Sequence, residues 1–134
     1  MGLGSKNEVC YQEYVYDFSV DGGAVGSINL TAKNGYDPID VGSVVKSVTY
    51  KQLVAFASGG AATVALGDQA SATRYKAATA FNDSTYNANA VAAGSGVPAH
   101  VTAANIGQVS LTIATAALTA GKMLVMVEFY KPTL

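Results

Sequence analysis

The alternation of apolar and polar side chains at every second residue constrains the fold of this chain more than any other feature. The first alternating run starts at Glu8 and carries Glu13 and Asp17 on one parity. The other parity holds Cys10, Tyr14, Tyr16, Phe18 and Val20. Successive side chains of a strand point to opposite faces, so this run predicts a β-strand with one buried face, which ends at Asp21-Gly22-Gly23.

A longer run follows in the middle of the chain. Residues 44–57 read as one β-like stretch, and because fourteen residues exceed an ordinary strand, we expect a bend or a bulge within it. Ser58-Gly59-Gly60 has the residue types of a tight turn with positive φ. It therefore predicts a hairpin that returns into a strand over residues 62–66.

The alanine-rich segment between residues 68 and 80 has a different spacing. Ser71 is a candidate N-cap, and Ala72, Tyr75 and Ala78 recur at helical intervals. This spacing predicts one short connecting helix.

The C-terminal part returns to β patterns. Val109, Leu111 and Ile113 alternate with polar or small residues, whereas residues 123–130 are apolar on both parities. A strand with two apolar faces is typical of a central position or of a face covered by a partner. We therefore expect this last strand to lie in the middle of its sheet.

These segments predict an all-β fold, namely an antiparallel two-sheet β-sandwich with about seven or eight strands and one short helical insert. A jelly-roll-like form is the expected variant. The length of 134 residues suits one domain. We expect residues 1–7, which lack periodicity, to form an N-terminal arm, and residues 8–134 to form a single domain.

The charge content limits the classes of partner. Charged residues make up 13% of the chain, against about 25% in an average soluble protein, so much of the exterior is neutral and easily desolvated by another subunit. The formal net charge of −1 gives no positive field for nucleic acid. No apolar run suits a membrane-spanning helix, and the start lacks a secretory core, so we expect a soluble, unexported protein that binds other proteins.

The residue types that carry chemistry are sparse. His100 is the sole histidine, and no acidic residue lies near it in the sequence, which argues against a catalytic triad. Asp37 and Asp40 are too few for a calcium loop, and zinc sites need several cysteines or histidines. We therefore predict no enzyme activity, no metal and no cofactor, and we expect Cys10 to be a buried, inert thiol.

The cluster of aromatic residues near the N-terminus has two readings. Tyr14, Tyr16 and Phe18 share the parity predicted to be buried, whereas Tyr11 lies on the opposite face. Core packing plus a protein interface is favoured over a sugar-binding platform, because the chain has no tryptophan. The candidate interface residues are Leu3, Lys6, Tyr11, His100 and Tyr130.

Three segments carry a resemblance to a known group of proteins. They are LVAFASGGAATVALG (53–67), YKAATAF (75–81) and IGQVSLTIATAALTAGKMLVMVEFY (106–130). They resemble a family of small alanine-rich structural proteins of tailed bacteriophages, over about the C-terminal two thirds of the chain. The resemblance implies a capsid decoration or cement protein on the head exterior, made in the host cytoplasm, which clusters as homotrimers and bridges the major capsid protein.

Two alternatives stay open at this stage. The same sandwich could serve as a receptor- or glycan-binding module of a head fibre, with sugar sites in loops such as residues 82–98. It could also be a tail-associated component, since long amphipathic strands form rings in tail tubes.

Overall fold

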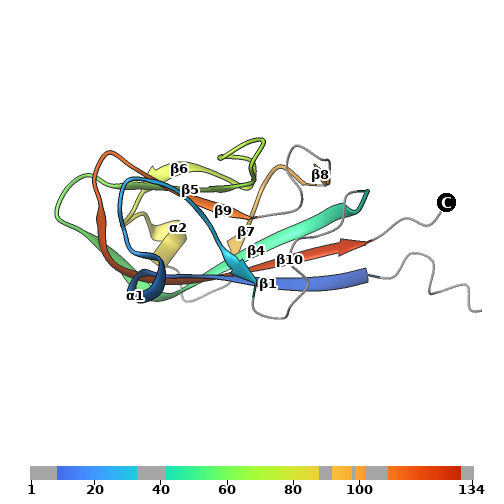
Figure 1. Ribbon diagram of the computed structural model, residues 1–134, viewed down its shortest axis with the longest axis horizontal. Helices are drawn as coiled ribbons and strands as arrows, with labels where there is room; N and C mark the ends of the chain where they lie inside the picture. Colours follow the sequence, from blue (N-terminus) through green and yellow to red (C-terminus); the bar gives the residue numbers. More distant parts are fainter. Residues whose placement is uncertain (1–8, 33–41, 88–91, 98, 102–108, 131–134) are drawn as a thin grey trace, which may run out of the picture.

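The computed structural model describes residues 9–32, 42–87, 92–97, 99–101 and 109–130, which form two stacked antiparallel sheets (Figure 1). The six-stranded sheet contains β1 (Val9–Asp17), β3 (Thr31–Ala32), β4 (Val44–Ser58), β7 (Ala92–Ala93), β8 (Ala99–His100) and β10 (Leu118–Tyr130). The four-stranded sheet contains β2 (Gly26–Asn29), β5 (Thr63–Gly67), β6 (Lys76–Ala80) and β9 (Ser110–Ala114). Two helices of one turn each, α1 (Phe18–Asp21) and α2 (Ser84–Asn87), complete the described elements. The predicted two-sheet β-sandwich is therefore confirmed.

The last strand lies where its pattern predicted. β10 pairs with β1 on one side and with β4 on the other, at the centre of the order β3-β1-β10-β4-β7. Its odd-numbered residues from Met123 to Phe129 are fully buried between the sheets, and its even-numbered ones are half-buried on the other side. The two apolar parities thus serve two different faces of one sheet.

The core fills the space between the sheets. Tyr14 and Tyr16 of β1 are fully buried and pack with Leu66, Leu111 and Ile113 of the four-stranded sheet in one hydrophobic cluster. Burial of side chains of this size contributes about 1.5–3 kcal/mol each. The parity assigned to the first strand is therefore confirmed as far as Tyr16.

The end of that strand departs from the prediction. β1 stops at Asp17, whose carboxylate accepts a hydrogen bond from the backbone N–H of Ser19 and thereby caps α1. The chain turns away from the sheet, so Phe18 is only partly buried and the Val20 side chain is 78% exposed. The prediction that Val20 continues the buried row was wrong, because a capping carboxylate ended the strand first.

The expected irregularity in the long central strand is present. The pairing of β4 with β10 shifts register at several points, including the steps from Lys122 to Met123 and from Glu128 to Phe129. These bulges leave Val54 outside the core, 50% exposed, although it has the same parity as the buried Tyr50 and Phe56.

Gly121 lies in the curved part of β10, with φ +146°. A Cβ at this position would stand 2.2 Å from the ring of Phe56. A glycine is needed for this close approach.

The predicted hairpin at Ser58-Gly59-Gly60 is absent. β4 belongs to the six-stranded sheet and β5 to the four-stranded sheet, so this segment carries the chain from one sheet to the other. Neither glycine is among the described residues with positive φ. The Ser58 hydroxyl instead donates to the carbonyl of Ala117, at the neighbouring connection into β10.

The predicted helix between residues 68 and 80 is also absent, and this part forms a turn followed by β6. The Asp68 carboxylate accepts the backbone N–H groups of Ala70 and Ser71 and pairs with the guanidinium of Arg74. These bonds fold the segment back on itself before a helix can start, and the helical insert of the fold lies at α1 and α2 instead.

Candidate interaction surface

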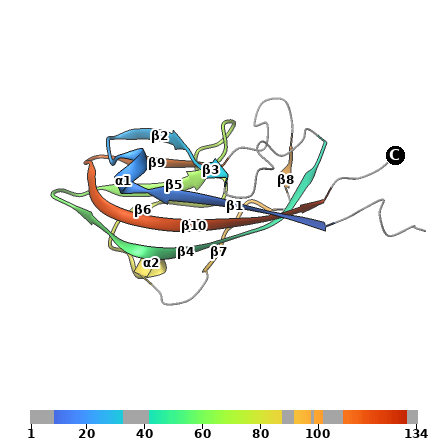
Figure 2. The ribbon, with the colours of Figure 1, turned by 60° about the horizontal axis from the view of Figure 1, so that its bottom comes forward.

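The outer side of the six-stranded sheet offers a broad surface built from three adjacent strands, β1, β10 and β4 (Figure 2). The register places Tyr11 beside Glu128, and Glu128 in turn beside Ser47. We call this surface the outer face, and it comprises Val9, Tyr11, Glu13, Val15, Asp17, Ser47, Thr49, Lys51, Lys122, Leu124, Met126, Glu128 and Tyr130.

Apolar residues occupy the middle of the outer face, and charges lie around them. Val15 is registered with Leu124, and Met126 follows on the same side of β10. The acidic groups of Glu13, Asp17 and Glu128 are balanced by the ammonium groups of Lys51 and Lys122 and by that of Lys46, which pairs with Glu128 from beside this surface. The outer face is thus apolar at its centre, with no excess of either charge.

Two ion pairs hold charged side chains of this surface in place. The Nζ of Lys46 lies 3.7 Å from Oε1 of Glu128, and the Nζ of Lys122 lies 3.8 Å from Oδ2 of Asp17. Such exposed pairs contribute about 0–1 kcal/mol to stability. They fix where each charge stands more than they stabilise the fold.

Tyr11 is the most exposed of the large hydrophobic side chains on the outer face, at 61%. Its hydroxyl is hydrogen-bonded to Glu128, and this bond together with the negative charge of that carboxylate raises the pKa of Tyr11. The ring borders a shallow hollow of about 220 Å³. The hollow is lined by Tyr11, Ser47, Thr49, Met126 and Glu128.

A second hollow of about 210 Å³ lies toward the other end of the same strands. It is lined by Asp17, Phe18, Ser19, Val54, Ala120, Gly121 and Lys122. Side-chain and backbone hydrogen bonds from Ser19 lower the pKa of Asp17, and so keep this hollow negatively charged on one side. The outer face therefore has a hollow toward each end and an apolar centre between them.

Three of the candidate interface residues gather at one end of the six-stranded sheet. Tyr130 is registered with Val9 on one side and with Val44 on the other, and Val44 is registered with His100 in β8. Tyr11 stands one step further along β1, on the same side as Val9. The sequence alone could not reveal this row, because its four positions lie on four strands that are far apart along the chain.

Leu3 and Lys6, the other two candidates, lie outside the described residues. The sequence also missed Leu53 and Val25, which are large apolar side chains exposed on the surface. Leu53 stands at a register shift of β4, where parity fails to predict which way a side chain faces.

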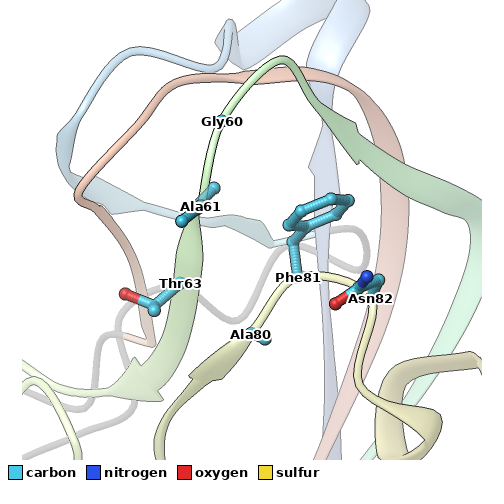
Figure 3. A pocket seen from close by; sticks show the side chains of 7 residues that line it. Gly60, Ala61, Thr63, Ala80, Phe81 and Asn82 are labelled. Atoms are coloured by element: carbon cyan, nitrogen blue, oxygen red, sulfur yellow. The ribbon is translucent and has the colours of Figure 1, made fainter.

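A separate hollow of about 530 Å³ lies between the start of β5 and the end of β6 (Figure 3). The Phe81 ring lies between the segment of Gly60 and Ala61 and the turn that carries Asn82. Phe81 is partly buried against the core, and no charged group lines the hollow. This site has room for an apolar group but no acid, base or nucleophile for chemistry.

The remaining chemistry of the described part is limited. Across residues 9–32, 42–87, 92–97, 99–101 and 109–130, no three side chains of the types His, Cys, Asp and Glu gather closely enough to hold a metal ion. Within those ranges no helix has the length and apolar character needed to cross a membrane. Cys10 is half-buried on the inward parity of β1, so its thiol is less enclosed than expected.

The fold has counterparts among solved structures. No protein-family model matches the chain, and no curated protein matches it by sequence. The chain is similar to one in the structure described as the cyanophage Pam1 capsid asymmetric unit, with a TM-score of 0.71 and 24% identity, over 98% of this chain and 91% of that chain. It is also similar to a chain of the acidic stable capsid structure of Helicobacter pylori bacteriophage KHP30, with a TM-score of 0.61 and 14% identity, over 93% and 89% of the two chains. The predicted jelly-roll-like sandwich is therefore a fold that chains of two phage capsid structures share.

Proposed function

We propose that this chain is a structural protein of a bacteriophage virion, a decoration or cement protein that binds the outer surface of the head. The observation that supports this most is the likeness of fold to chains of two phage capsid structures, which runs over more than nine tenths of the present chain. A role in the virion also accounts for the low charge content, because subunits that pack on neighbours desolvate small neutral residues at little cost.

The mechanism we propose is mechanical. Each copy bridges neighbouring subunits of the major capsid protein, and the binding energy must be lost before the shell expands or bursts. We place the shell contact at the end of the sheet where Val9, Tyr130 and β8 share a row, and we propose that the arm of residues 1–7 contributes to the same contact. The arm would add a strand to the sheet edge of a neighbouring subunit.

We further propose that the protein forms homotrimers on the capsid exterior after synthesis in the host cytoplasm. Trimers suit junctions between capsomers, since three copies engage three sets of capsid subunits at once. Multivalent attachment turns modest single contacts into tight binding.

The test uses phage heads produced without this protein, to which the purified chain is added back. We expect the chain to sediment with the heads and to raise the temperature at which they release DNA. Tyr130→Ala should weaken the binding, whereas the matched change Thr73→Ala, at an exposed turn position, should leave it intact. Failure to bind heads, together with binding to tails or to a glycan array, would overturn the proposal in favour of a tail-associated or receptor-binding module.

A further inference from the structure

We propose that the outer face is a self-association surface, on which two copies pack face to face with their β10 strands antiparallel. The occupant of the outer face is thus a second copy of this chain. This inference goes beyond the proposed function, because it assigns a contact between copies rather than a contact with the shell.

The order of side chains along β10 is the main reason. Lys122, Leu124, Met126 and Glu128 point outward in turn, with opposite charges at equal distances from the midpoint between Leu124 and Met126. A twofold axis through that midpoint places Lys122 of each copy against Glu128 of the other. It also places Leu124 against Met126, so along β10 apolar groups meet apolar groups and each charge meets its opposite.

Two positions of the neighbouring strand fit the same axis, whereas Glu13 stands against Val15 of the other copy. Tyr11 is registered with Glu128, and Asp17 is registered with Lys122, so these two positions of β1 also lie at equal distances from the axis. The exposed Tyr11 ring of one copy then lies over the hollow that Asp17 and Lys122 border in the other. On association, its phenol can exchange its bond to Glu128 for one to the Asp17 carboxylate, which also accepts hydrogen bonds from Ser19.

The alternative orientation is excluded by charge. An axis parallel to β10 would place Glu128 against Glu128 and Lys122 against Lys122, and like charges held directly opposite each other repel. Only the antiparallel orientation pairs unlike charges. This internal matching favours a second copy over a different protein, since a different partner has no need for a self-complementary surface.

The size of the outer face predicts a weak contact. Four rows of side chains, from Lys122 to Glu128, about 6.7 Å apart on three strands about 4.8 Å apart, give roughly 400 Å² per copy. Stable interfaces bury about 800 Å² per partner. The contact should therefore form at high protein concentration in solution, or where copies are held side by side on a shell.

The experiment is a charge-reversal exchange with the full chain, using Glu128→Lys and Lys122→Glu as separate variants. In a pair of identical variants, like charges meet at both symmetry-related contacts. In a mixed pair, the two substituted side chains carry opposite charges and meet at one contact, while the native pair stands at the other. The mixture should therefore regain association. Thr73→Lys serves as the matched control, because this exposed turn residue lies away from the outer face.

Sedimentation velocity up to millimolar concentration measures the outcome, and thermal unfolding verifies that each variant is folded. We expect the wild type and Thr73→Lys to associate, each reversal alone to weaken association about tenfold or more, and the mixture to return to the wild-type level. A wild type that stays monomeric at the highest concentration overturns the inference. So does association that both single variants retain, or a mixture no better than its components.

Binding to empty heads is measured separately, which keeps the two proposals distinguishable. If the chain binds heads but fails the exchange experiment, the proposed self-association surface is rejected and the proposed virion role stands. If the chain passes the exchange experiment but does not bind heads, the self-association surface stands and the proposed virion role is rejected.

Discussion

The Tyr86 hydroxyl donates a hydrogen bond to the backbone carbonyl of Val64, so a side chain of α2, which packs beside β4 of one sheet, reaches a strand of the other. The pairing of β5 with β6 shifts register between Val64 and Leu66. The phenol satisfies a carbonyl at that irregularity. Its ring packs edge-on against Phe56 and tilted against Tyr50, which closes the core beside β4.

Tyr86→Phe should lower the free energy of unfolding by about 1–3 kcal/mol, because it keeps the ring but removes a hydrogen bond to a buried carbonyl. Urea denaturation measures the change. Tyr11→Phe is the matched control, since that hydroxyl is exposed and its loss should cost less than about 0.5 kcal/mol. Equal effects from the two changes would contradict the role assigned to the Val64 bond.

Gln12 is fully buried on β1, and among the described residues neither its amide nitrogen nor its amide oxygen has a hydrogen-bond partner. Burial of such a group without compensation is costly, so Gln12→Met, which keeps the length of the side chain, should stabilise the fold by about 1–2 kcal/mol. Gln52→Met, on the half-buried part of β4, should bring no such gain in the urea midpoint. A loss of stability in Gln12→Met would show that the amide is satisfied in solution.

Gly67 ends β5 directly against the turn that Asp68 organises. A Cβ at this position would lie 2.1 Å from the carbonyl oxygen of Ser71 and 2.4 Å from the carbonyl carbon of Ala72. Because these are backbone atoms, the turn itself would have to move, and Gly67→Ala should cost about 2–3 kcal/mol or more. Gly59→Ala is the control, since nothing lies within 4 Å of its Cβ position, and differential scanning calorimetry should find it nearly neutral. Comparable melting points for both variants would refute the steric argument.

The sequence predicted those parts of the fold that depend on which side of a strand is buried. Alternation placed Tyr14 and Tyr16 in the core and Tyr11 outside it, and the two apolar parities of the last strand predicted its central position. Burial of one face of a strand requires apolar residues at every second position, so this part of the fold can be predicted from the order of residues.

The sequence failed where the outcome depends on distant partners. Ser58-Gly59-Gly60 permits a turn, but whether the next strand returns to the same sheet is decided by β9 and β6, which pair with β5. The alanine spacing suggested a helix before β6. The Asp68 carboxylate instead accepts hydrogen bonds from the backbone N–H groups of Ala70 and Ser71 and holds this segment in a turn. The common row of Tyr130 and His100 likewise needed the register of four strands.

Removal of residues 1–7 should separate attachment from folding. β1 begins at Val9, so its pairing with β10 is retained, and the free energy of unfolding should change by less than about 0.5 kcal/mol. Cosedimentation with empty heads should weaken, because the proposed arm can no longer add a strand to a neighbour. An arm of the same composition in scrambled order is the control for length alone. Heads that bind the truncated chain as tightly as the intact one would end the arm hypothesis.

Alkaline pH should destabilise the fold through its buried tyrosines. Burial raises the pKa of Tyr16 to about 12, with further contributions from the carboxylates of Asp21 and Asp17, and its hydroxyl donates to the carbonyl of Gly22 at 2.6 Å. Burial also raises the pKa of Tyr75 to about 12. An unfolded tyrosine ionises near pH 10, so between about pH 10 and 12 the unfolded state releases protons that the folded state retains.

The stability that these tyrosines contribute is therefore fully present below about pH 10 and falls as pH rises toward 12. Urea midpoints measured across that range should decrease steeply for the wild type and less steeply for Tyr16→Phe. At neutral pH the variant should have the lower midpoint of the two, because it lacks the hydrogen bond to the carbonyl of Gly22. The chain has no tryptophan, so near-ultraviolet absorbance reports tyrosine ionisation cleanly. Identical slopes for the two proteins would mean that the Tyr16 phenol titrates alike in the folded and unfolded states.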